Sequence, residues 1–443
     1  MVRAVSGVVG EYVRQVRESG RNPRLYLQGL FLIGLGQSIF SLLFNLYLRT
    51  LGISDSGIGQ ILSKVSLGAA IAAIPAAFLF RGMQARLILV GAGAFAALLY
   101  VMQVSWTAPE TLLLIAFLTG MAATVYRLSI APVIMREVAP AARPFLFSAS
   151  FTVLFLSAIV GFAVGGWLPR LFHTITDVDR LALRWSLYVA AGLILSSAIP
   201  FNAMKEAPPG ERDPEDEEAE RLGAPLRRWS DRFGWTLRQA RELIEVDWVL
   251  NLKLVLPAML IGLGAGLIIP FMNLFFHDRF GMNEAEIGLL FAVMQGFMVV
   301  GNLFGPAVSR RLGLVRGVVV TQLLSVPFMV LLGVSSFFPI VAAAFFLRSG
   351  LMNMNQPLTS HFAMEVVSKR DHAVTNSLLS LSWFVAWSVS ADIGGAMIER
   401  YGYTPPLLVA AGLYVAASGL YWIFFKDIEE GRVPRGEVEI PEA

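Results

Sequence analysis

The segment Leu32-Ile33-Gly34-Leu35-Gly36 recurs 228 residues later as Leu260-Ile261-Gly262-Leu263-Gly264. Two further pairs fall in that register: Asn45-Leu46 with Asn273-Leu274 and, one inserted residue later, Gly165-Gly166 with Gly394-Gly395. Several matches in a single register indicate that one unit has been duplicated along the chain. The fold is therefore predicted to consist of two similar halves.

The composition predicts a membrane protein. Of 443 residues, 56% are hydrophobic and 15% are charged, whereas soluble domains are about 25% charged. Apolar runs of about 20 residues, the length that crosses a bilayer, occur at 25–48, 57–80, 87–106, 111–135, 145–169, 185–203, 249–276, 287–308, 317–335, 338–364, 373–397 and 405–425. The predicted fold class is an all-α membrane protein with twelve transmembrane helices in two pseudo-symmetric six-helix bundles.

The distribution of Lys and Arg predicts the orientation. With the N-terminus in the cytoplasm, inner segments hold 25 of these residues and outer loops hold six, as the positive-inside rule requires. Both termini are therefore expected to be cytoplasmic. The predicted parts are a cytoplasmic amphipathic segment (1–24), the first bundle (25–203), a cytoplasmic linker with a basic amphipathic helix (204–248), the second bundle (249–425) and a cytoplasmic tail (426–443).

Three short motifs carry a family resemblance. Phe117–Ala123 (FLTGMAA), Arg136–Pro140 (REVAP) and Gly305–Gly313 (GPAVSRRLG) are similar to segments of the major facilitator superfamily. The last one lacks the usual Asp. Together with the six-plus-six pattern, the chain resembles this superfamily over residues 25–425. The resemblance implies the major facilitator fold, alternating access and a substrate site between the halves near the midplane.

Two opposite charges lie at similar predicted depths. Lys64 is about 10 Å and Asp392 about 8 Å from the outer ends of their spans. A charged side chain at mid-bilayer costs about 2.5–3.5 kcal/mol on insertion scales, so each needs a partner or a wet cavity. One hypothesis pairs them as an outer gate. Alternatively, each belongs to a local network in its own half, or Asp392 is a proton-coupling acid that releases Lys64.

Two arginines lie deeper still. Arg127 is predicted about 12 Å from the inner end of its span, and Arg348 about 15 Å from the outer end of its own. Guanidinium groups there suit a phosphate or carboxylate on the substrate. A structural role, with hydrogen bonds to carbonyls at nearby proline breaks, competes equally for Arg127. The polar neighbour Asn353 favours Arg348 as a binding residue.

Four neutral amides are further candidates for substrate binding. Asn45 and Asn273 occupy equivalent positions in the two halves, and the resemblance implies that they lie at the centre of the cavity. Gln37 and Gln295 are the other two. Each of the four could instead bond a neighbouring helix, an interaction worth about 0.6–2 kcal/mol.

Two acidic residues lie at the predicted inner ends of their spans. Glu137 and Glu365 stand near Arg-rich loops. Ion pairs with those arginines would hold the cytoplasmic side shut, so gating is a better interpretation than substrate contact.

The sequence thus predicts a monomeric secondary-active transporter in a prokaryotic plasma membrane, binding a small anionic or lipid-like organic solute, and protons are the candidate coupling ion. The alternatives are proton-coupled efflux of hydrophobic or cationic drugs and a non-transporting receptor on the same fold. No GxxxxGK[ST] motif is present, which argues against an ATP-driven pump acting alone. An enzyme is disfavoured because the four His are scattered, and the absence of Cys excludes thiolate chemistry. No cofactor, metal or nucleic acid is expected.

Overall fold

A computed structural model describes residues 20–82, 84–138, 142–205, 246–368 and 371–429. Most of the predicted amphipathic segment 1–24, of the linker 204–248 and of the tail 426–443 lies outside these described residues.

The described chain is helical, with no strand in these ranges. Helices preceding the linker are α2 (Arg21–Thr50), α3 (Asp55–Gly82), α4 (Ala85–Ser105), α5 (Pro109–Glu137), α6 (Arg143–Phe172), α7 (Asp179–Ser196) and α8 (Ala198–Asn202). Those following it are α11 (Trp248–Ile268), the 3-10 turn η2 (Ile269–Phe271), α12 (Met272–Phe280), α13 (Glu284–Leu312), α14 (Leu314–Val334), α15 (Phe338–Val366), α16 (His372–Tyr401) and α17 (Thr404–Glu429). Every predicted span coincides with a helix or with consecutive helices, which confirms the all-α class.

Ten helical segments are long and apolar enough to cross a membrane, counted over the described residues. The two remaining predicted spans are α3 and α15. Polar residues lower the hydropathy of α15, since Arg348, Asn353, Asn355 and Gln356 all lie in its middle.

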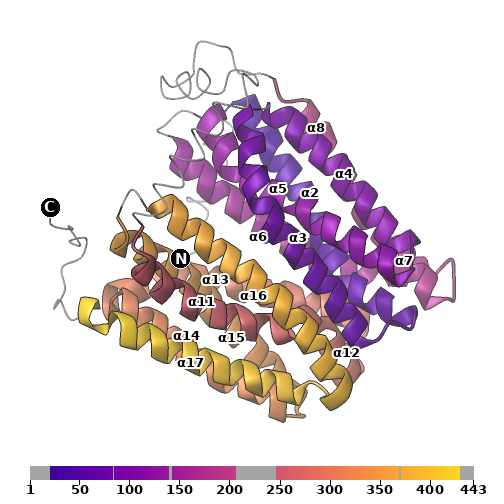
Figure 1. Cartoon of the computed structure of the whole chain (residues 1–443). Helices are drawn as coiled ribbons and strands as arrows, with labels where there is room; N and C mark the ends of the chain where they lie inside the picture. The colour runs from indigo at the N-terminus through magenta and orange to yellow at the C-terminus, as the bar shows by residue number, and fades with distance from the viewer. Residues whose placement is uncertain (1–19, 83, 139–141, 206–245, 369–370, 430–443) are drawn as a thin grey trace, which may run out of the picture. The chain divides into compact units, whose positions relative to one another are not determined.

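The helices cluster into two compact units. The first consists of the described parts of Met1–Leu51 and Ile71–Leu237, and the second of those of Gly52–Ala70 and Arg238–Ala443. In the first unit α2 packs on α6 and α7, and α4 packs on α5 and α7. In the second unit α11 packs on α16 and α17, α13 on α15, and α14 on α15 and α17 (Figure 1). The beginning of α3 belongs to the second unit.

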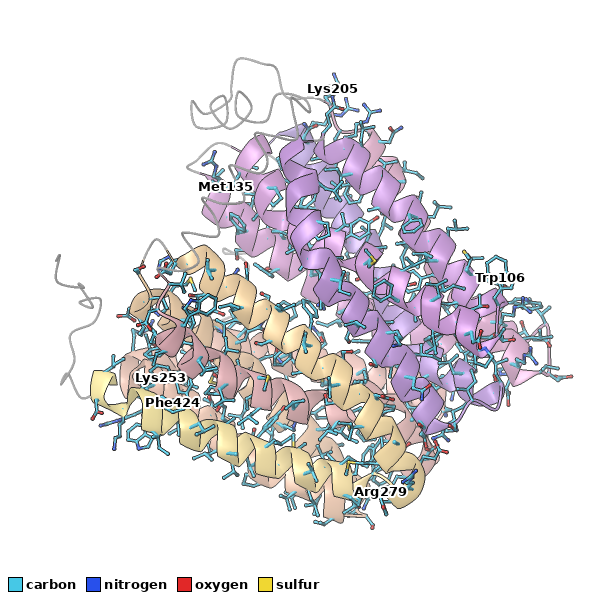
Figure 2. All side chains as sticks on the ribbon, viewed as in Figure 1. Trp106, Met135, Lys205, Lys253, Arg279 and Phe424 are labelled. Carbon is cyan, nitrogen blue, oxygen red and sulfur yellow. The ribbon has the colours of Figure 1, made fainter. Side chains whose placement is uncertain are left out.

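The long axis of each unit is marked by its labelled side chains. Lys205 and Trp106 lie at opposite ends of the first unit, and Lys253 and Arg279 at opposite ends of the second (Figure 2). By the predicted orientation, Lys205 and Lys253 mark the inner ends. A reciprocal pair ties the inner ends of α2 and α8 together, because Asn22 donates to the carbonyl of Lys205 at 2.6 Å and accepts from its N–H at 2.9 Å.

The duplicated sequence produces equivalent turns. Gly52 and its repeat partner Gly281 both have positive φ, 77° and 63°, a conformation that glycine adopts without steric penalty. Gly281 ends α12 as a left-handed cap. Two residues on, the Asn283 side chain accepts from the N–H groups of Ala285 and Glu286 and forms a capping box that starts α13.

Two predicted spans are interrupted in the structure: 185–203 between α7 and α8, and 249–276 at the turn η2. The apolar run 249–276 folds as α11, the turn η2 and α12 rather than as one helix. Pro270 stands in the turn, and it can neither donate a backbone hydrogen bond nor avoid a clash with the preceding turn. The equivalent helix α2 runs without interruption from Arg21 to Thr50.

Two pairs of glycines four residues apart, Gly161 with Gly165 on α6 and Gly301 with Gly305 on α13, pack inside their own units. A Cβ added at Gly161 would lie 2.9 Å from the Leu35 carbonyl oxygen of α2. A Cβ at Gly301 would overlap the carbonyl oxygen of Gly350 on α15. These glycines therefore serve close packing of neighbouring helices.

Two glycines of α13 are expected to respond to alanine with opposite sign. An alanine at Gly301 meets the backbone of α15, so it should lower stability by about 1–3 kcal/mol. A Cβ at Gly296 meets nothing within 4 Å, so Gly296→Ala should raise stability by up to about 1 kcal/mol through helix propensity. Thermal unfolding of the two detergent-purified variants provides the measurement, and shifts of equal sign would contradict the described packing of α13 on α15.

Candidate functional site

Four charged residues lie deep within helices. Among the described helices, only Lys64, Arg127, Arg348 and Asp392 are charged and at least eight residues from both helix ends. Three cations against one acid leave two positive charges in excess. Because charge inside a membrane is costly and needs compensation, this excess favours an anionic binding partner.

Arg348 of α15 is the most enclosed of the four, with 5% of its surface exposed. Its Nη2 donates to the hydroxyl of Tyr414 on α17 at 3.0 Å, and its Cζ lies 5.6 Å from the centre of that ring. Its Nε is buried and has no hydrogen-bond partner. Within the described ranges no carboxylate pairs with Arg348, and no helix carbonyl near Pro357 accepts from it.

Arg127 of α5 is exposed although it lies at mid-helix. Its charge is within electrostatic range of Tyr100 on α4, whose ring packs at 4.2 Å on Phe40 of α2. The residue is exposed as a whole, while burial desolvates the guanidinium itself.

The predicted amides differ in accessibility. Asn45 and Asn273 are both 3% exposed, and Gln295 is 9% exposed, so these three are buried within their own units. Asn273 accepts from the N–H of Leu274 at the start of α12. Gln37 is half-buried. Asn353 is half-buried as well, and it donates to the carbonyl of Ser349 in its own helix at 3.0 Å.

A close seam joins the first turns of α3 to the last turns of α16 within the second unit. Glu399 Oε2 accepts from the N–H of Ser56 at 2.9 Å, where the start of α3 carries partial positive charge. Further in, the hydroxyls of Ser63 and Ser388 lie 3.0 Å apart, and Ser388 also donates to the Ser63 carbonyl at 2.9 Å.

Glycine allows the seam to close. A Cβ at Gly59 would lie 2.6 Å from the carbonyl oxygen of Ala391 and 3.1 Å from the Cα of Gly395. A Cβ at Gly395 would overlap the carbonyl oxygen of Asp55. The two backbones are thus in direct contact, and no larger side chain fits between them without separating the helices.

Lys64 and Asp392 flank this seam. Each lies nine residues from the predicted outer end of its helix, so their equal depths agree with expectation. Lys64 is half-buried and Asp392 is exposed. No ion pair or hydrogen bond joins them in the described structure, where the seam uses Ser63 and Glu399 instead. Their pairing stays a prediction.

Only part of the predicted inner latch, the ion pairs of Glu137 and Glu365 with nearby arginines, falls within the described residues. Glu365 is half-buried near the end of α15. Glu137 is the last residue of α5, and its side chain lies outside what the structure describes. Arg86 donates to Asn202 at the end of α8 at 2.7 Å. The latch stays a prediction.

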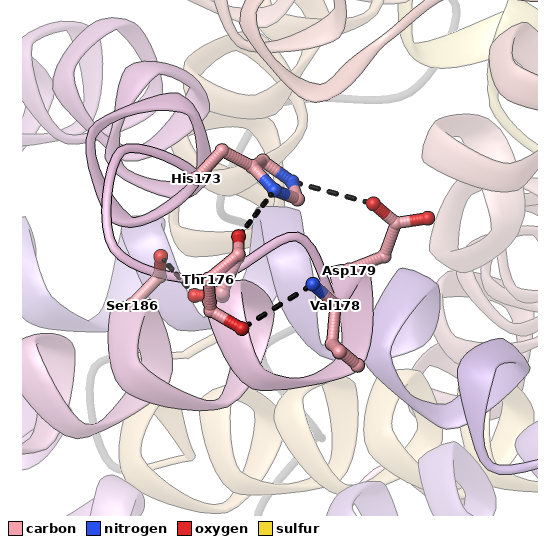
Figure 3. Close-up of polar contacts among 6 residues, drawn as sticks. His173, Thr176, Val178, Asp179 and Ser186 are labelled. Carbon is pink, nitrogen blue, oxygen red and sulfur yellow. Dashed lines mark hydrogen bonds and ion pairs between the residues drawn. The ribbon is translucent and has the colours of Figure 1, made fainter.

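His173 belongs to a loop rather than to a membrane-embedded reaction site. Its Nε2 lies 3.3 Å from Asp179 Oδ1 across the α6–α7 connection, and its Nδ1 contacts the carbonyl of Thr176 at 3.2 Å (Figure 3). Thr176 also accepts from the N–H of Val178. These bonds stabilise the connection between the two helices. Over the described residues, no three His, Asp or Glu side chains gather as a metal site.

Sequence reasoning missed several residues of these arrangements, among them Tyr414, Glu399, Ser56, Ser63 and Ser388. Tyr414 lies 66 positions from Arg348 in a mostly apolar helix, so no local pattern identifies it. Glu399 could have been considered, because it is an acid in the last turn of a helix whose partner begins with unpaired N–H groups.

A duplicated helical unit and multiple membrane-crossing helices define a polytopic membrane protein with charges deep inside its spans. The chain belongs to the Major Facilitator Superfamily, whose family model matches residues 27–253 and 254–442. The two matched stretches correspond to the internal repeat, and the resemblance seen in the sequence is confirmed. Family membership identifies the chain with a superfamily of membrane transporters.

Individual relatives are distant. A "Putative sugar efflux transporter" from Deinococcus radiodurans is 29% identical over 182 residues, which cover 40% of this chain and 46% of that protein. The chain thus spans about half the length of this curated relative. A bacterial homologue of the human lysosomal transporter Spinster, in an inward-facing and occupied conformation, matches with a TM-score of 0.73 and 13% identity, covering 93% of this chain and 98% of that one. The nucleoside transporter NupG matches at 0.69 with 14% identity, covering 92% and 100%. At these identities the structural likeness shows the fold.

Proposed function

We propose that this protein is a secondary-active transporter that moves a small organic anion, or an amphiphile with an anionic head group, by alternating access. The observation that carries the proposal is the excess of deep positive charge, namely Lys64, Arg127 and Arg348 against Asp392. A carrier for cations would need the opposite balance, because a buried charge is best compensated by its opposite.

Arg348 is the residue proposed to bind the anionic group. Its guanidinium has donors without a protein partner, as the buried Nε shows, and such a fork suits carboxylate or phosphate oxygens. Arg127 is proposed to contribute positive charge along the substrate's path. The amides Asn45, Asn273, Gln37, Gln295 and Asn353 are proposed as neutral polar contacts.

We further propose in which membrane the transporter acts, which residue couples it to protons and which residues gate it. The transporter is proposed to act as a monomer in a prokaryotic plasma membrane, with both termini in the cytoplasm, as the Lys and Arg distribution favours. Lys64 and Asp392 are proposed to gate the outer side by pairing when it is closed, and Asp392 is also the candidate for proton coupling. Glu137 and Glu365 are proposed to latch the inner side.

Sugar efflux is a second candidate. It is favoured by the 29% identity to the Deinococcus protein over 182 residues. Sugars are bound mainly through neutral hydrogen bonds, so the buried amides would then outweigh the arginines.

Thermal unfolding of the full-length, detergent-purified protein against a panel of compounds tests the proposal. The panel contains lysophosphatidic acid, decanoate, glucose, sucrose and tetraphenylphosphonium, with monoacylglycerol as the uncharged match of the lysolipid. A compound at 100 times its dissociation constant should stabilise the fold by about 2.7 kcal/mol. Stabilisation by the anions supports the proposal. Stabilisation by sugars alone supports sugar efflux, and stabilisation by the cation alone overturns the anion proposal and favours a site at Asp392.

A further inference from the structure

The surroundings of Arg348 are unusual for a buried cation. One neutral hydroxyl, that of Tyr414, accepts from its Nη2 at 3.0 Å, while its Nε has no partner. Arginine has five N–H donors, and burying them without acceptors is costly. A residue with a purely structural role would be expected to satisfy these donors within the described helices. Arg348 instead keeps most of them uncommitted.

Tyr414 is held firmly from two sides. It is 1% exposed, and its ring lies against Gly264 of α11, where an added Cβ would be 2.8 Å from Cε1. Its main-chain carbonyl oxygen accepts from Ser418 Oγ at 2.8 Å, and that hydroxyl also lies 2.9 Å from Gln322 Oε1 on α14. Burial and the contact with Gly264 restrict the ring that presents the hydroxyl to Arg348.

We propose that Tyr414 is a positioning residue that orients the Arg348 guanidinium for the anionic group of the substrate. Its hydroxyl takes one of the five donors and fixes the rotation of the guanidinium plane, leaving the other four N–H groups, including the buried Nε–H, for the oxygens of a carboxylate or phosphate. Preorganisation of this kind lowers the entropy lost on binding. The inference rests on the proposed function, since it assumes that Arg348 contacts an anion.

The burial of the pair fits a group that is covered in one state of a carrier. With 5% of Arg348 exposed, an anion reaches it only when the surrounding helices move apart. The hydroxyl of Tyr414 keeps the guanidinium from collapsing onto other acceptors in the covered state.

A second tyrosine of α17 provides a matched control. Tyr421 is equally buried, with 2% exposed, and lies two helical turns from Tyr414. Its ring packs on those of Phe362 and Phe425, and it is Tyr414, not Tyr421, whose hydroxyl accepts from Arg348. Removing that hydroxyl therefore tests the loss of a buried tyrosine oxygen that does not bond Arg348.

The experiment measures dissociation constants of the full-length protein in detergent for lysophosphatidic acid, glycerol 3-phosphate and monoacylglycerol. Tyr414→Phe removes only the hydroxyl, so it should weaken lysophosphatidic acid binding about tenfold and leave monoacylglycerol binding unchanged. Tyr421→Phe should change neither. If glycerol 3-phosphate also binds and Tyr414→Phe weakens its binding by the same factor, the site recognises a free phosphate ester. If only lysophosphatidic acid binds, the site recognises the head group of a lipid.

Three outcomes overturn the inference or its premise, and they can be told apart. Unchanged lysophosphatidic acid binding in Tyr414→Phe, alongside a loss in Arg348→Gln, overturns positioning but leaves the proposed function standing. An equal loss for lysophosphatidic acid and monoacylglycerol in Tyr414→Phe also overturns positioning, because the hydroxyl then serves packing. Full binding in Arg348→Gln overturns the premise itself.

A second variant covers the case in which Tyr414→Phe does not fold. Gly264→Ala pushes against the ring of Tyr414 and retains its hydroxyl. It should weaken lysophosphatidic acid binding relative to monoacylglycerol in the same direction, and an unchanged ratio of the two dissociation constants overturns the inference.

Discussion

A leucine at position 395 is expected to separate α3 from α16 and to reduce transport at least tenfold while the protein still folds. The Cβ alone would overlap the carbonyl oxygen of Asp55 and lie 3.0 Å from the Cα of Gly59, and the larger side chain has no space in the seam. Packing of α16 on α11 and of α13 on α15 does not involve this seam, so folding should persist. Alternating access requires the outer side to close, and a propped seam prevents it.

Thiol labelling measures the opening of the seam independently of any substrate. The chain has no Cys, so Ser63→Cys introduces a single reactive thiol at the position that contacts Ser388. Its reaction with a maleimide should be at least tenfold faster when Gly395→Leu is present. Gly412→Leu on α17 is the control, because a Cβ there meets nothing within 4 Å. A thiol that stays protected, together with undiminished lysophosphatidic acid flux in Gly395→Leu proteoliposomes, would show that the seam is not a gate.

Replacing Arg348 by glutamine is expected to act in two opposite directions. Loss of charge-assisted hydrogen bonds, worth about 1.5–3 kcal/mol each, should weaken anion binding about 100-fold. Without ligand, the same change should raise the unfolding temperature, because it removes a buried cation that has no carboxylate partner in the described structure. A substitution that stabilises the protein and removes its ligand response distinguishes a binding residue from a structural one.

The matched control for this second prediction is Arg400→Gln. Arg400 is exposed near the end of α16, so its loss should change neither the unfolding temperature nor anion binding. Thermal unfolding of the unmodified protein, Arg348→Gln and Arg400→Gln is measured with and without lysophosphatidic acid. It gives the unfolding temperature of each protein and its response to the anion. A lower unfolding temperature in Arg348→Gln with an intact response to the anion would mean that Arg348 holds helices together.

The helices were predictable because apolar runs of bilayer length have few alternative structures in lipid. The ends of the helices were less predictable than their existence. The helix α2 begins at Arg21 and ends at Thr50, so it extends beyond the predicted span 25–48 at both ends. Amphipathic ends such as these carry charged residues that a hydropathy window excludes. The break at Ile269–Phe271 was also missed, since Pro270 sits among strongly apolar residues that dominate the run.

The candidate site was predictable only in its charges. Lys64, Arg127, Arg348 and Asp392 stand out because polar atoms are rare at their depth. Their partners are not encoded locally. The hydroxyl of Tyr414 and the seam of Ser56 with Glu399, separated by 343 positions, arise from how helices rotate about their axes, which side-chain packing decides. Equal depth for Lys64 and Asp392 likewise did not determine that their side chains meet.

The broken helix of the second unit also records the history of the chain. Pro270 corresponds through the 228-residue repeat to Leu42, which lies inside the continuous helix α2. The two copies of one segment thus have different backbones, and Pro270 stands where they differ. The first copy is one continuous helix, whereas a 3-10 turn separates two helices in the second. The duplicated halves therefore differ in the main chain as well as in sequence.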